Sequence, residues 1–109
     1  MADQIQLAVA CSLTDAAFRE RRDVVQRALF SGQTGSAVEG DGYRFRFPPD
    51  DVWLSRITEF VLAERQCCPF LTFRIEVPAG ATGIDLRLSG PPGSAAFIEQ
   101  TFLARTATD

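Results

Sequence analysis

The chain contains no histidine and no lysine, and all 11 of its cationic side chains are arginines. Without histidine, it lacks the usual general base and the imidazole metal ligand. Without lysine, it lacks the residue that forms Schiff bases and the one that binds phosphates in a P-loop. Any chemistry must therefore use cysteine, carboxylate, arginine, hydroxyl side chains or the single tyrosine, Tyr43.

Other absences limit the partners and the location that we expect. The net charge is −3, so no basic surplus attracts nucleic acid. The N-terminus has no cationic region, and the apolar stretch from Leu7 to Cys11 is too short for a signal peptide or a membrane span. We therefore expect a cytoplasmic protein with neither nucleic acid nor a membrane as partner. Three cysteines without an export signal favour free thiols over a disulfide framework.

The length and composition are those of a small globular protein. The chain has 109 residues, of which 46% are hydrophobic and 23% are charged. This predicts one domain over residues 1–109 with a hydrophobic core of its own.

Periodicity along the chain predicts five strands and three helices. Apolar and polar residues alternate over 5–11, 43–47, 71–77 and 84–88, and a weaker strand covers 36–39, joined to the next by a hairpin turn. Helices are predicted from Thr14 or Asp15 to Gly32, from Asp50 or Asp51 to Pro69, and over 95–103. On the first helix, the pattern predicts an inward stripe of Phe18, Val24, Val25, Ala28 and Leu29, and a solvated face of Arg19, Arg22, Asp23 and Gln26.

This order of elements predicts an α+β fold. Strands that alternate between apolar and charged residues have one face in water, so the helices should pack on one side of a mostly antiparallel sheet. The best match is a ferredoxin-like β-α-β-β-α-β core with an extra strand and a C-terminal helix. The open face of the sheet is predicted either to be solvated through cross-strand ion pairs or to form a homodimer; it would carry Arg44, Arg46, Arg74, Glu76, Asp85 and Arg87.

One turn at the end of the middle helix gathers the groups that suit a metal ion. Cys67 and Cys68 follow Glu64 by three and four positions, so their side chains share a face of the helix. Cys11, at the end of the first predicted strand, is a candidate fourth ligand. Neighbouring thiols suit thiophilic ions such as Hg(II), As(III) or Cu(I), provided that they open into a pocket that a small ion can enter.

Several other interpretations compete with a metal site. The negative end of the helix dipole and Glu64 both disfavour a thiolate, which argues against a cysteine nucleophile. Redox sensing would need a bridge from Cys11 to Cys67 or Cys68. Alternatively, the cysteines are core packing in an interaction or assembly domain, and Glu64 makes a salt bridge to an arginine or a partly exposed cap contact. A carboxylate enzyme using Glu64 is least favoured, because no second catalytic partner is identifiable.

Three runs of sequence resemble a known family. They are Tyr43-Arg44-Phe45-Arg46-Phe47-Pro48, residues 64–73 and Leu86-Arg87-Leu88-Ser89-Gly90-Pro91. They are similar to a family of small, uncharacterised bacterial proteins marked by Glu-x-x-Cys-Cys-Pro-Phe and loosely associated with mercury- or arsenic-resistance contexts. The similarity covers most of the chain. It directs attention to Glu64, Cys67 and Cys68 and implies no particular reaction.

Overall fold

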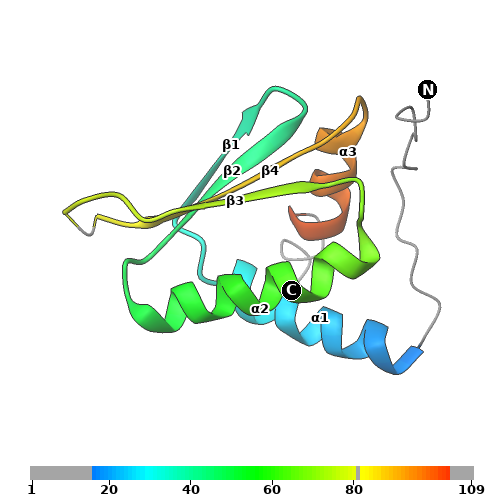
Figure 1. Cartoon of the computed structure of the whole chain (residues 1–109), viewed down its shortest axis with the longest axis horizontal. Helices are drawn as coiled ribbons and strands as arrows, with labels where there is room; N and C mark the ends of the chain where they lie inside the picture. Colours follow the sequence, from blue (N-terminus) through cyan, green and yellow to red (C-terminus); the bar gives the residue numbers. More distant parts are fainter. Residues whose placement is uncertain (1–15, 81, 104–109) are drawn as a thin grey trace.

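A computed structural model describes residues 16–80 and 82–103 (Figure 1). The elements follow the predicted order from the first helix onward. They are α1 (Ala16–Phe30), β1 (Gly35–Glu39), β2 (Gly42–Phe47), α2 (Asp51–Cys67), β3 (Thr72–Glu76), β4 (Ile84–Ser89) and α3 (Ser94–Ile98), which continues as a π-helical turn, η2 (Glu99–Leu103). The predicted strand over 5–11, including Cys11, lies outside the described residues, as do both candidate caps of the first helix.

The four described strands form one antiparallel sheet in the order β1-β2-β4-β3. β2 and β3 are both antiparallel to β4, so they are parallel to each other, with α2 connecting them and β4 between them. This is a split β-α-β unit, consistent with a ferredoxin-like arrangement. Figure 1 shows the sheet above α1 and α2, and α3 packs against β2 and β4. The predicted α+β class, with helices on one face of an antiparallel sheet, is confirmed.

Phenylalanines join the two layers. The ring of Phe30 at the end of α1 lies 4.9 Å from Phe45 on β2, 5.2 Å from Phe60 on α2 and 5.3 Å from Phe102. Burial of each such ring contributes roughly 1.5–3 kcal/mol. On β2, Phe45 and Phe47 are fully buried, as the alternation of apolar and polar residues over 43–47 predicts.

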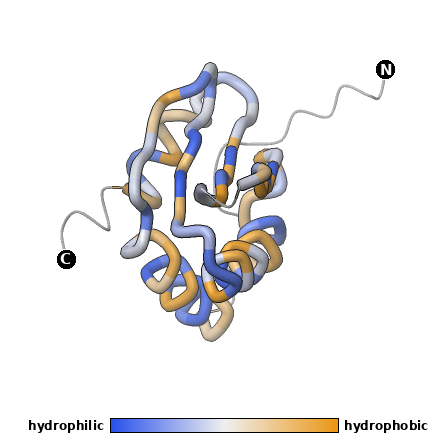
Figure 2. The backbone as a smooth tube through the Cα atoms, turned by 90° about the vertical axis from the view of Figure 1, so that its left-hand side faces the viewer, coloured by the Kyte–Doolittle hydropathy of each residue, from blue (hydrophilic) through white to orange (hydrophobic). Residues whose placement is uncertain are grey.

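The buried stripe of α1 differs from the one predicted. Its buried residues are Arg22, Gln26, Leu29 and Phe30, whereas Val24 is 67% exposed. The prediction of a solvated Arg22 and Gln26 is therefore wrong, as is that of an inward Val24 and Ala28, which are both exposed. The two polar residues share a helical face with Leu29 because they precede it by seven and three positions. In Figure 2, hydrophilic and hydrophobic stretches alternate along the helices.

The outer face of the sheet carries the predicted charges, joined in pairs across the strands. Arg46 on β2 donates two hydrogen bonds to Asp85 on β4, at 2.8 and 3.1 Å. Arg87 on β4 contacts Glu39 on β1 and Glu76 on β3. The predicted cross-strand ion pairs are confirmed, and they explain how a charged strand face is stable with no helix among the described elements covering it.

Candidate functional site

The last turn of α2 positions the predicted site. The helix ends at Cys67, and the backbone N–H of Cys68 donates to the carbonyl oxygen of Glu64 at 2.6 Å. Pro69 explains this end, because a proline disfavours helical conformation in the residue before it. Glu64 follows Ile57 and Phe60 on the buried stripe of the helix, as its spacing predicts.

Glu64 is fully buried, and α1 supplies its partners. Arg22 Nε donates to Glu64 Oε2 at 2.8 Å, and Gln26 Nε2 donates to the same oxygen at 2.6 Å. An unpaired charge in such a place would cost several kcal/mol, about 3–5 where one partner of a buried pair is removed. Of the two structural explanations for Glu64, the salt bridge is confirmed and the partly exposed cap contact is wrong.

The Cys68 thiol faces the other oxygen of the same carboxylate. Its Sγ donates to Glu64 Oε1 at 3.5 Å, and the side chain is fully buried. Burial, followed by the negative charge of Glu64, raises the pKa of Cys68 to about 12, although Arg22 acts in the opposite direction. Cys68 is therefore a protonated thiol at neutral pH. This agrees with the prediction that the site disfavours a thiolate nucleophile.

Cys67 is also fully buried, and it is disulfide-bonded, whereas Cys68 is free. The expectation of free thiols is thus wrong for Cys67. Residue counts and spacing do not reveal which sulfurs meet in the folded chain, and that contact decides whether a bridge forms. The proposed fourth ligand, Cys11, lies outside the described residues.

The fold brings three of the four predicted ligands together. One oxygen of Glu64 and the sulfurs of Cys67 and Cys68 all lie within 4.8 Å of one another. Since thiolates are the sulfur species that bind metals, Cys67 can act as a ligand only after its disulfide is reduced. In the reduced form, the cluster offers two sulfurs and one oxygen.

A cleft of about 330 Å³ lies between α1 and α2, but none of the three ligands lines it. All three ligands are fully buried, so the expectation that they open into a pocket is wrong. Arg22 forms the partition: it is only 6% exposed, it lines the cleft, and it binds Glu64. Sequence reasoning missed Arg22 and Gln26 as parts of the site. Arg22 and Gln26 are four residues apart, and Leu29 and Phe30 continue the same face of the helix. This spacing was the signal that could have placed both polar residues on the buried face.

No helix in the described part of the chain is long and apolar enough to cross a membrane. Comparisons of the chain with protein-family models, with curated proteins and with solved structures find no match.

Proposed function

We propose that the protein, with Cys67 reduced, binds one thiophilic metal or metalloid ion through Glu64, Cys67 and Cys68. The observation that carries this proposal is the meeting of their ligand atoms within 4.8 Å of one another in a fully buried place. A carboxylate has a large cost of burial, and this one is oriented by two side chains of another helix.

The two oxygens of Glu64 have separate tasks in this proposal. Oε2 is held by Arg22 and Gln26, and Oε1 points to the sulfur of Cys68. An ion next to the sulfurs can take Oε1 without breaking the bonds of Oε2 to α1. Such outer contacts orient a ligating carboxylate and tune its affinity for the metal.

The donor set favours soft ions. Two cysteines are adjacent, and the chain has no histidine to complete a typical zinc site, which needs four nitrogen or sulfur ligands. Soft ions such as Hg(II), Cu(I) and As(III) prefer sulfur. Coordination also deprotonates a thiol outright, which overcomes the raised pKa of Cys68. The resemblance of this run to a family associated with mercury and arsenic resistance supports the choice of these ions as probes.

Loading of the site begins with reduction. A dithiol reductant supplies two electrons and two protons, the disulfide at Cys67 is cleaved into two thiols, and the reductant becomes a disulfide. The ion then forms a bond to each sulfur of the site, and each of the two thiols releases its proton to solvent. Oxidation would therefore close the site, and reduction would open it.

Titration of the fully reduced chain with Hg(II) tests the proposal, with ultraviolet absorption of the mercury–sulfur bonds as the readout. We expect one tightly bound ion per chain that resists competition by a small monothiol. The variant Cys67→Ser/Cys68→Ser should bind no more tightly than a single thiol does, since it keeps only Cys11.

The matched control is Cys11→Ser, which keeps both sulfurs of the site. Under reducing conditions it should retain the tight binding and the stoichiometry, and a loss would place the site elsewhere. Equal affinities of the wild type and the double serine variant would contradict the proposal. Circular dichroism of each reduced variant separates loss of binding from loss of fold.

A second candidate function, self-association through the outer face of the sheet, is favoured by the register of its arginines. Arg44, Arg87 and Arg74 lie directly opposite one another across β2, β4 and β3. Arg74 is exposed and makes no ion pair within the residues described, while Glu76 beside it is half-exposed. Two copies facing each other can join these unlike charges.

Sedimentation velocity over a range of protein concentrations tests this second candidate. We expect a dimer that weakens as salt is added, because exposed charges are screened. Arg74→Glu should shift the chain to the monomer, whereas Arg65→Glu, an exposed position on α2 away from the sheet, should not. A strict monomer at high concentration would exclude association through this face.

A further inference from the structure

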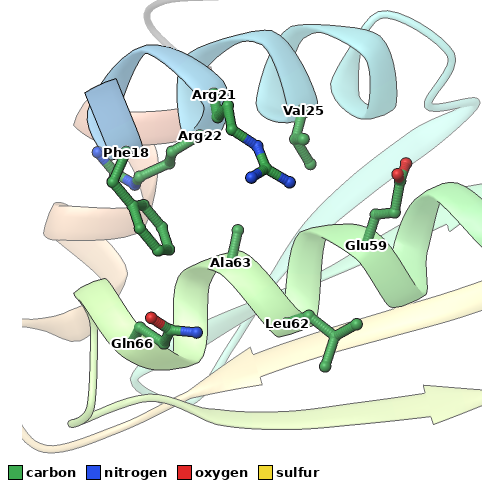
Figure 3. A pocket seen from close by; sticks show the side chains of 8 residues that line it. All are labelled: Phe18, Arg21, Arg22, Val25, Glu59, Leu62, Ala63 and Gln66. Carbon is green, nitrogen blue, oxygen red and sulfur yellow. The ribbon is translucent and has the colours of Figure 1, made fainter. Parts of the chain in front are cut away.

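The cleft between α1 and α2 has apolar walls. Phe18 and Val25 line it from α1, and Leu62 and Ala63 line it from α2. Figure 3 shows Phe18 reaching from the first turn of α1 toward α2, and Ala63 pointing into the space between the helices. Leu62 is 55% exposed. An exposed apolar wall of this kind at a concave surface is typical of a ligand site.

Two opposite charges stand at this cleft without pairing. Figure 3 shows Arg21 extending from α1 over the cleft. Glu59 stands on α2, toward the same end of the cleft as Val25 of α1. Both side chains are exposed, and neither makes an ion pair with any part of the chain that the structure describes. The cleft therefore presents one available cation and one available anion beside an apolar surface.

The ligand that complements this pattern carries both charges. A simple organic anion would meet Arg21 but bring its negative charge near Glu59, and a simple cation would have the opposite difficulty. A zwitterion satisfies both: its carboxylate accepts hydrogen bonds from the guanidinium, and its ammonium donates to the glutamate. An apolar side chain on the same molecule would cover Phe18 and Leu62.

We propose that this cleft binds a small zwitterion with an apolar side chain, the class that contains apolar α-amino acids and their dipeptides. The volume of about 330 Å³ limits the ligand to this size, since it lies near the lower end of ligand pockets. The site does not use Glu64, Cys67 or Cys68, so it stands apart from the proposed ion site.

Three probes of the same shape and different charge test the proposal. They are L-phenylalanine, 3-phenylpropanoate, which lacks the ammonium, and phenethylamine, which lacks the carboxylate. Isothermal titration and amide chemical-shift mapping measure the binding. We expect phenylalanine to bind most tightly and to shift amides of residues 18–25 and 59–66. Alanylphenylalanine, as a fourth probe, distinguishes a dipeptide ligand from a free amino acid by its relative affinity.

Variants at the two charges give the decisive comparison. Arg21→Gln should weaken phenylalanine about tenfold, the effect of losing one charge-assisted hydrogen-bonding group. Glu59→Gln should also weaken phenylalanine but should leave 3-phenylpropanoate equally or more tightly bound. Arg19→Gln and Glu20→Gln are matched controls, because both positions are exposed on α1 and neither lines the cleft.

The proposal is overturned if none of the probes binds, if 3-phenylpropanoate or phenethylamine binds the wild type as tightly as phenylalanine, or if Arg19→Gln weakens binding as much as Arg21→Gln. All four substituted side chains are exposed, so the variants should fold. The cysteine variants of the ion site should retain phenylalanine binding, which separates this inference from the proposed function.

Discussion

At the scale of single residues, the most unusual feature is a buried ion pair between two helices. Arg22 and Glu64 are held at 2.8 Å with side-chain exposures of 7% and 0%. Such a pair does not by itself make a protein more stable than a well-packed apolar contact would. In the proposed function, this buried carboxylate has a task besides stability, which is to bind the ion.

The pair gives a prediction about stability. Arg22→Met should lower the free energy of unfolding by about 3–5 kcal/mol, because it leaves the buried carboxylate of Glu64 without its cation. Glu64→Leu should also destabilise the protein, and the double variant Arg22→Met/Glu64→Leu should recover much of the loss. Urea unfolding of the four proteins measures the coupling.

Arg19→Met is the control for this cycle, since Arg19 is exposed on the same helix, and it should change the stability by less than about 0.5 kcal/mol. Strictly additive effects of the two substitutions would mean that the side chains are not coupled. The spacing of Glu64 from Ile57 and Phe60 predicts that it lies on the buried stripe of α2, and a salt bridge to an arginine was one of two explanations for it. The sequence could not choose among 11 arginines, because the partner is 42 residues away and is selected by helix packing.

At the scale of elements, the prediction succeeded for strands and failed in part for α1. Alternation in β2 and β4 identified the buried faces correctly, because successive side chains of a strand point to opposite sides. On α1, the apolar residues are spread around the helix and do not mark one stripe. The helix therefore turns the face of Leu29 and Phe30 inward, which buries Arg22 and Gln26 and exposes Val24.

The pair of Arg46 and Asp85 links β2 to β4 and makes the sheet sensitive to acid. Asp85 is 4% exposed although it lies on the outer face. The hydrogen bond from Arg46 holds the pKa of Asp85 below its usual value, against the opposing effect of burial. The unfolded chain therefore takes up this proton more readily than the folded one. The stabilisation is present above the unfolded pKa, about 3.9, and is lost as the pH falls through the folded value.

We therefore expect Asp85→Asn to destabilise the protein at pH 7 and to flatten the dependence of unfolding free energy on pH below about pH 4. Urea unfolding at a series of pH values measures both effects. Asp41→Asn, an exposed position in the β1–β2 turn, serves as the control and should leave the pH dependence unchanged. An unaltered acid slope in Asp85→Asn would show that other carboxylates cause the acid sensitivity.

At the scale of the whole molecule, the layer arrangement was predictable and the neighbours of each strand were not. Half-charged strands require one open sheet face, and this predicts helices on the other side. The place of β4 between β2 and β3 depends on contacts across the sheet, including Phe45 opposite Leu86 and Phe73 opposite Leu88. Local periodicity carries no information about which strands meet.

The sequence alone determined the α+β class, the end of α2 shortly before Pro69, and the common face of Glu64 and the two cysteines, because these follow from repeats of two and 3.6 residues and from the geometry of proline. Tertiary structure alone decided that Arg22 pairs with Glu64, that Cys67 is disulfide-bonded while Cys68 is free, and that all three ligands are fully buried. The pair of Arg22 and Glu64 joins side chains that are 42 residues apart in the sequence, and only the packing of α1 against α2 brings them into contact.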